Sequence, residues 1–164
     1  MKEKWNVNVV LCEQCDEDVE NIQKIFNKIT VRNTTPPFYI VTFINGIGVG
    51  NCLELFYCID KVDTAHLKRA YAGKVKFDRK KEAAHFSDGS EKKGTVENCC
   101  IDMFRSRVSE LKFPGGGEYE LKVYGFTDRE EVNEIDNMDW KERRSKFTDD
   151  NLFATYPFKV DVIN

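Results

Sequence analysis

The chain has 164 residues, of which 41% are hydrophobic, 32% charged and 12% aromatic, and its formal net charge at pH 7 is −3. With 10 glycines and 4 prolines, this composition excludes collagen-like, low-complexity and wholly disordered chains. A chain of this length buries roughly 68–70% of the surface that it exposes when unfolded, so neither disulfides nor a metal is needed for stability. We therefore expect residues 1–164 to form a single domain.

The sequence also bears on the cellular location. No apolar stretch reaches the ~18–20 residues that a membrane-spanning helix needs, and residues 1–5 precede only a short apolar run that contains Asn6 and Asn8. Because no export signal is visible, we expect a cytoplasmic protein without membrane contact. Cytoplasmic thiols stay reduced, and we expect this of all six cysteines: Cys12, Cys15, Cys52, Cys58, Cys99 and Cys100.

Three strands are predicted in the first part of the chain. Residues 5–12 alternate in polarity, which gives one strongly apolar face: Trp5, Val7, Val9 and Leu11. Residues 38–44 are rich in aromatic and β-branched side chains and give the strongest strand signal. Residues 52–59 form a second apolar run after a loop that contains glycines, so residues 38–59 are predicted to be a β-hairpin.

Two segments fit either a helix or a strand. In residues 22–31, Ile22, Ile25 and Ile29 recur at helical spacing, which narrowly favours a helix, although the β-branched composition suits a strand. Residues 98–108 are equally ambiguous, and their Cys-Cys-Ile run favours a strand.

Two short helices are predicted more clearly. Asp63 or Thr64 can cap a helix over Ala65–Tyr71, which ends before Gly73. Residues 138–147 contain many good helix formers and predict the second helix.

The late part of the chain again indicates strands. Residues 113–117 end in three glycines that can adopt positive φ and reverse the chain, so residues 118–126 are predicted to belong to a second hairpin. Residues 156–162 alternate too, and Pro157 favours an edge strand or the first position of a strand. The fold class that follows is mainly β: an antiparallel β-sandwich of roughly seven to nine strands with one or two short helices.

Four segments carry a resemblance to a known family: Val9–Cys12, Ile25–Ile29, Pro36–Val41 and Phe113–Leu121. They resemble a family of uncharacterised bacterial and phage β-sandwich proteins. In that family a strand ending in cysteine leads to an Ile-Phe-Asn strand, a Pro-Phe-Tyr strand and a late Gly-x-Tyr strand. The resemblance implies that residues 22–31 are a strand, and it implies no catalytic residues, because no activity is established for the family. Residues 61–93 and the stretch after Thr127 depart from the family pattern.

No cofactor or metal is expected from the sequence. Cys12 and Cys15 have the spacing of half a zinc site, but a closed site needs four ligands and no second pair of this spacing is present, so we expect buried thiols. His66 and His85 stand in no acid–base or nucleophile signature. The glycines of residues 46–50 precede an apparent strand, whereas a dinucleotide-binding loop opens a helix.

Charge is distributed unevenly along the chain. Residues 61–93, a basic and insertion-like region, hold ten basic and five acidic residues, a balance of +5. Residues 127–150 hold five basic and nine acidic residues, a balance of −4. The split could steer an acidic partner to the first region, or let the two regions lie against each other or against neighbouring copies. The candidate partner-binding residues are Lys68, Arg69, Lys74, Lys76, Arg79, Lys80 and Lys81.

We therefore expect a non-enzymatic binding or interaction module that holds another protein, or a second copy of itself, through loops or a sheet edge. Nucleic acid is not an expected partner, because the net charge has the wrong sign for strong nonspecific binding and no recognition signature is present. The alternative is a small enzyme or a nucleotide-ligand-binding protein whose pocket is assembled from dispersed residues. Assembly of a phage or bacterial particle is a third possibility.

Overall fold

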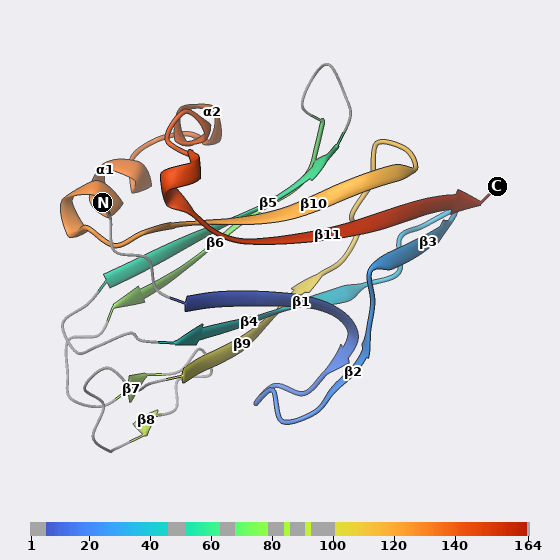
Figure 1. Ribbon diagram of the computed structural model, residues 1–164, viewed down its shortest axis with the longest axis horizontal. Helices are drawn as coiled ribbons and strands as arrows, with labels where there is room; N and C mark the ends of the chain where they lie inside the picture. The colour runs from blue at the N-terminus through green and yellow to red at the C-terminus, as the bar shows by residue number, and fades with distance from the viewer. Residues whose placement is uncertain are drawn as a thin grey trace.

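Two β-sheets stacked face to face make up most of the protein (Figure 1). The computed structural model describes residues 6–45, 52–62, 68–78, 84–85, 91–92 and 101–163. Within these residues the first sheet has the strand order β2 (Ile22–Ile25), β1 (Asn6–Cys15), β4 (Phe38–Asn45) and β9 (Ile101–Val108). The second sheet has the order β3 (Lys28–Arg32), β11 (Leu152–Ile163), β10 (Gly117–Phe126), β5 (Cys52–Lys61) and β6 (Lys68–Asp78). The predicted mainly β, sandwich-like fold class is thus confirmed.

Most neighbouring strands in the two sheets are antiparallel, but β3 runs parallel to β11. A separate antiparallel pair joins β7 (Ala84–His85) to β8 (Glu91–Lys92).

The main hydrophobic core lies between the inner faces of the two sheets. As predicted, the first strand buries one alternating face, which comprises Val7, Val9 and Leu11. From the other side, β5 contributes its own alternating set: Leu53, Leu55, Tyr57 and Ile59. A 2.7 Å hydrogen bond between the hydroxyls of Thr42 and Tyr57 links the sheets inside this core.

Both predicted hairpins are wrong, because in each case the chain crosses from one sheet to the other. β4 pairs with β1 and β9, whereas β5 pairs with β10 and β6. β9 and β10 are likewise in different sheets, although Gly115 and Gly117 do adopt positive φ. The reason is burial: strands in facing sheets cover each other's apolar inner faces, which neighbours within one sheet cannot do.

The two ambiguous segments form strands where the structure describes them, and residues 98–100 of the second segment lie outside the described part of the chain. Residues 22–31 contain β2 and most of β3, so their helical periodicity was misleading, and residues 101–108 form β9. The predicted helix over Ala65–Tyr71 is wrong at residues 68–71, which begin β6; residues 63–67 lie outside the described part of the chain. Tyr71 and Val75 of β6 pack against the main core, and this burial outweighs local helix propensity.

The prediction that Pro157 marks an edge strand is also wrong. β11 is a central strand between β10 and β3. Pro157 pairs with Glu120 of β10, and the parallel pairing with β3 begins only at Lys159. The proline therefore stands in the part of β11 that has no described ladder partner on the β3 side, where a missing N–H is tolerated.

A helical cap, residues 128–151, connects β10 to β11 and covers one end of the outer face of the second sheet (Figure 1). It contains α1 (Arg129–Asp136), α2 (Trp140–Arg144) and the 3₁₀ helix η1 (Asp149–Asn151). The predicted helix over residues 138–147 is present as the shorter α2, whereas α1 was not predicted. In the described residues no helix is long and apolar enough to cross a membrane.

Side-chain caps and aromatic packing fix the helical cap on the sheet. The carboxylates of Asp128 and Asp139 accept hydrogen bonds from backbone N–H groups in the first turns of α1 and α2. Beneath the helices, the ring of Phe56 on β5 lies 5.8 Å from Trp140 and 5.4 Å from Phe147, measured between centroids. Such aromatic contacts add to the area that the cap buries.

Candidate functional site

The basic residues nominated from the sequence centre on β6, the terminal strand of the second sheet. β6 pairs with β5 on one side, and no described strand pairs with its other side. Residues 68–78 therefore form a strand of the second sheet. Lys68, Arg69 and Lys74 have described side chains. The side chain of Lys76 lies outside the described part of the structure, as do Arg79, Lys80 and Lys81 altogether.

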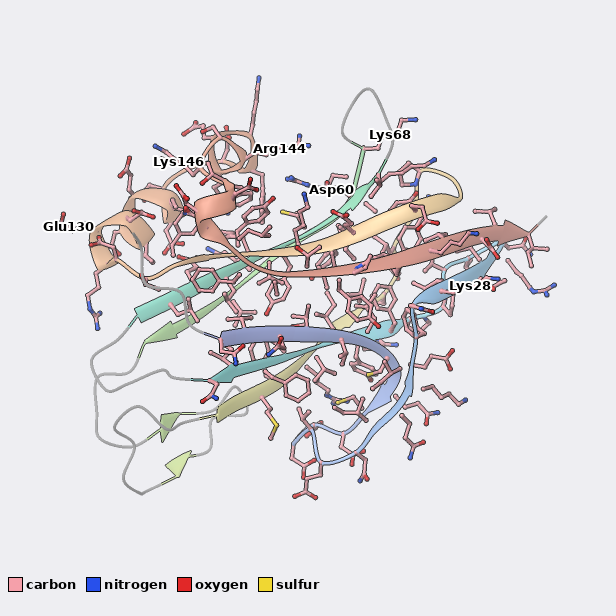
Figure 2. The ribbon with its side chains drawn as sticks, viewed as in Figure 1. Lys28, Asp60, Lys68, Glu130, Arg144 and Lys146 are labelled. Carbon is pink, nitrogen blue, oxygen red and sulfur yellow. The ribbon has the colours of Figure 1, made fainter. Side chains whose placement is uncertain are left out.

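The first two cations of β6 have different environments; Figure 2 labels Lys68 and Asp60, the partner of Arg69. Lys68 is exposed and stands opposite Lys61 in the ladder, so like charges face each other there. Arg69 instead pairs with Asp60, with 3.3 Å between Nε and Oδ1, and both side chains are largely buried. The side chain of Arg69 therefore forms an ion pair within the protein, whereas the side chain of Lys68 is exposed to solvent.

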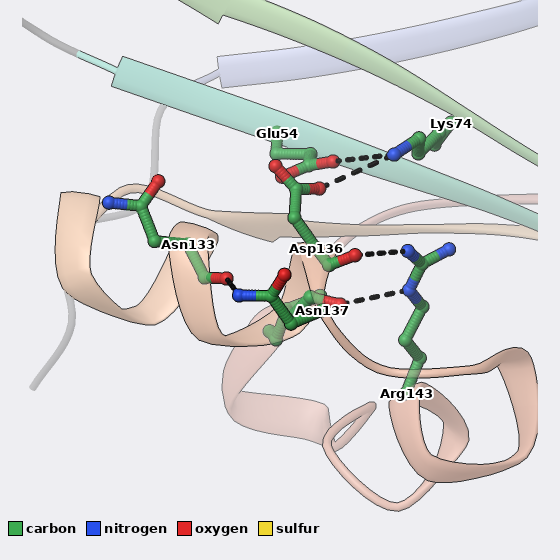
Figure 3. Close-up of polar contacts among 7 residues, drawn as sticks. Glu54, Lys74, Asn133, Asp136, Asn137 and Arg143 are labelled. Carbon is green, nitrogen blue, oxygen red and sulfur yellow. Dashed lines mark hydrogen bonds and ion pairs between the residues drawn. The ribbon is translucent and has the colours of Figure 1, made fainter.

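Lys74 joins β6 to the helical cap (Figure 3). Its Nζ lies 3.4 Å from Oδ1 of Asp136 at the end of α1 and 3.8 Å from Oε1 of Glu54 on β5. The side chain of Glu54 is fully buried, whereas that of Lys74 is about half exposed. A single ammonium group thus lies between two carboxylates that come from different elements.

Arg143 holds the two helices of the cap together beside this cluster (Figure 3). Its Nε donates to the carbonyl of Ile135 at 3.0 Å, and its Nη2 donates to the carbonyl of Asp136 at 3.1 Å. The guanidinium also lies 5.6 Å from the ring centroid of Phe56. The arginine satisfies carbonyls at the C-terminal end of α1, where a cation is favourable.

Two neighbouring cavities, here called the acidic groove, lie between the helical cap and strands β10 and β11. Their volumes are about 300 and 270 Å³, and both are lined by Phe126, Glu131 and Asp150. Glu134 and Asn151 line the first cavity, and Asp128 and Phe153 line the second. The groove therefore has aromatic side chains and several carboxylates in its walls.

The described thiols are buried and protonated. Cys12, Cys15 and Cys58 are free cysteines and lie in the interior. Burial raises the pKa of Cys12 and Cys58 to about 11, so few thiolates form near neutral pH. The other three cysteines, Cys52, Cys99 and Cys100, have no described side chains.

The remaining candidate groups give no catalytic constellation in the described structure. His66 lies outside the described residues, and His85 is described only as backbone in β7. Among the described residues no three histidine, cysteine or carboxylate side chains are placed to hold a metal ion.

Sequence reasoning missed Glu54 and the acidic groove. Glu54 did leave a signal, because it is the one carboxylate inside the apolar run of residues 52–59. The only sequence signal of the groove was the excess of acidic residues in the range 127–150. The turns of the helical cap determine which of these carboxylates line the same cavity, and the sequence does not show those turns.

A comparison of the sequence with protein-family models finds no match, and a comparison with curated proteins finds none either.

Proposed function

We propose that this protein is a non-enzymatic binding module that pairs β6 with an acidic, extended segment of another protein. The observation that carries the proposal is the position of β6 at the end of the second sheet. A terminal strand presents a row of backbone N–H and C=O groups, and an extended peptide that adds to it gains main-chain hydrogen bonds. The 11 residues of β6 are held along their length by β5, which makes the strand a firm template.

Charge favours an acidic partner over a second copy of the same edge. Lys68 is exposed, Lys74 is half exposed, and residues 79–81 continue the basic run in the sequence. Two copies that paired through β6 would bring these cations close together, and like charges across a ladder are destabilising. A partner strand rich in Asp and Glu would instead gain both ladder hydrogen bonds and favourable charge contacts.

The thiols support the non-enzymatic part of the proposal. A small enzyme that used cysteine would need a thiolate near neutral pH, whereas burial keeps Cys12 and Cys58 protonated. Free Cys12, Cys15 and Cys58 also support a cytoplasmic location, where thiols stay reduced. The resemblance to bacterial and phage β-sandwich proteins supports a bacterial or phage source for this protein. The net charge of −3 supports a protein partner over nucleic acid.

A labelled peptide series tests the proposal by fluorescence anisotropy. Peptides that alternate Glu with Thr or Val should bind, and binding should weaken as salt increases. Their Lys-containing counterparts should not bind. On binding, backbone amides of β6 should become better protected from hydrogen exchange, since an added strand covers that edge.

Matched charge variants locate the surface. The double variant Lys68→Glu with Lys76→Glu should abolish peptide binding. The control double variant, Lys112→Glu with Lys141→Glu, changes the net charge by the same amount at exposed positions outside β6 and should still bind the peptide. Equal loss in both double variants, or no binding by any acidic peptide, would overturn the proposal. A dimer of the pure protein that the first double variant disperses would show that the edge serves self-association instead.

A further inference from the structure

We infer that the acidic groove binds an alkylammonium group, as found in a linear polyamine or in the lysine side chain of a peptide. The site uses residues of the helical cap, β10 and the start of β11, and it does not depend on the proposed function of β6.

The charge of the first cavity favours a cation. Glu131, Glu134 and Asp150 line it, against the single cationic side chain of Lys146. An ammonium group has three donors and no acceptor, and ionised carboxylates only accept hydrogen bonds, so the two sets match. A divalent metal fits less well, because the described carboxylates do not form a group able to hold a metal ion.

A buried amide in the same cavity points independently to a ligand. Asn151 is only 4% exposed and lines the cavity. Its backbone N–H bonds to the carbonyl of Thr148. No hydrogen bond to its side-chain amide is described, and the amide is not among the described polar atoms that are sealed from solvent without a partner, so it opens onto the cavity. Buried polar side chains are normally hydrogen-bonded. The carbonyl oxygen of this amide can accept one of the ammonium hydrogens.

The shape and walls of the groove suit a thin ligand with a methylene chain. Each cavity is near or just below the lower end of the range of roughly 300–1,000 Å³ that is usual for small-molecule sites. Phe126 lines both cavities, and Phe153 lines the second. Aromatic faces attract ammonium groups and also contact methylene groups. Because carboxylates line both cavities, a chain with two cationic groups can place one in each.

Isothermal titration calorimetry tests the site with the full chain. We expect spermidine or a short Lys-Lys peptide to bind, and to bind more tightly than the monoamine butylamine. Spermidine binding alone identifies a free polyamine as the ligand, and peptide binding alone identifies a lysine side chain. Affinity should fall as salt increases. Failure of all three amines to bind at low salt would overturn the inference.

Variants separate the groove from general attraction to an acidic protein. Glu134→Gln with Asp150→Asn should weaken binding by about tenfold or more, because charge-assisted hydrogen bonds are lost. Lys146→Gln should tighten it, because a competing cation is removed. Glu130→Gln removes one negative charge from the first turn of α1, outside the groove, and should leave the affinity unchanged. Equal affinity in the wild-type protein and the Glu134/Asp150 double variant would overturn the inference.

A direct readout comes from the amide itself. The side-chain NH2 resonances of Asn151 should shift on titration with the amine that binds, and they should shift less in the Glu134/Asp150 double variant. Resonances that stay unchanged while heat is released would place the amine elsewhere and would also overturn the inference.

Discussion

The ammonium nitrogen of Lys74 lies 3.4 Å from Oδ1 of Asp136, although 62 positions separate the two residues in the chain. This ion pair joins the basic region of the sequence to the acidic one within a single molecule. Asp136 ends α1, where a carboxylate is unfavourable against the helix dipole and no basic residue stands in the last turn. Lys74 from the sheet therefore joins Arg143 of α2 in supplying the cations that α1 itself lacks at this end.

Lys74→Met should lower the free energy of unfolding. The change removes the cation beside the fully buried carboxylate of Glu54. Breaking a buried pair costs about 3–5 kcal/mol, and because Lys74 is about half exposed we expect a loss nearer 1–3 kcal/mol. Urea denaturation measures the loss. Lys68→Met, at an exposed position, should cost about 0.5 kcal/mol or less, and an equal loss in both variants would contradict the role of the pair. Adding Glu54→Gln to Lys74→Met should recover part of the stability.

Tyr57→Phe should destabilise the fold through the hydroxyl left on Thr42. The two hydroxyls are 2.7 Å apart in the core, and an unsatisfied buried group costs about 1–3 kcal/mol. Thr42→Val should have a similar effect for the same reason. The double variant should be less destabilised than the sum of the two single variants, because neither hydroxyl is then left alone. Additive losses in thermal unfolding would show that the bond does not couple the sheets.

Gly125→Ala should destabilise the contact between β10 and β11. A Cβ at position 125 would lie 2.7 Å from Cε2 and 2.9 Å from Cδ2 of Phe153, so the ring would have to move. We expect a loss of about 1–3 kcal/mol in chemical denaturation, as for other overpacked sites. Phe153→Leu removes the ring and serves as the reference background. If Gly125→Ala costs the same in that background, the cause is not this clash.

Stability should fall as the pH rises through the alkaline range. Cys12 and Cys58 have pKa values raised to about 11 by burial, whereas a thiol in an unfolded chain has a pKa near 8.5. Below about pH 8.5 both states hold these protons, so the thiols add no pH dependence. Above it the unfolded chain binds fewer protons, and the free energy of unfolding decreases with pH. Urea denaturation under reducing conditions from pH 7.5 to 9.5 measures the slope, which should be smaller with Cys12→Ala and Cys58→Ala combined. An unchanged slope would assign the effect to other groups.

The sequence predicted the strands with alternating or continuous apolar residues, missed β6, and predicted the strand partners poorly. Alternation in Val7, Val9 and Leu11 reports which face is buried, and that depends only on neighbouring residues. Whether residues 38–44 and 52–59 pair side by side or face each other depends on what lies across the core, which is not local. The sequence nominated the lysines but assigned Lys68 to a helix, whereas the structure places it on the terminal strand β6. The partners of Lys74 come from β5 and α1, far away in the sequence. The cavity beside Asn151 depends on how the cap turns after β10, and periodicity carries no signal for that.

The link between β3 and β11 has a consequence for how the molecule is made. The hydroxyl of Tyr156 donates to the carbonyl of Phe26, 130 positions earlier, and β3 pairs with the end of β11 from Lys159 onward. A ribosome that adds about 5–20 residues per second takes on the order of 10 s to cover that distance. During this interval the nascent chain exposes β3 without its neighbour in the sheet. Synthesis rate and chaperone supply should therefore govern how much of the protein reaches the native state.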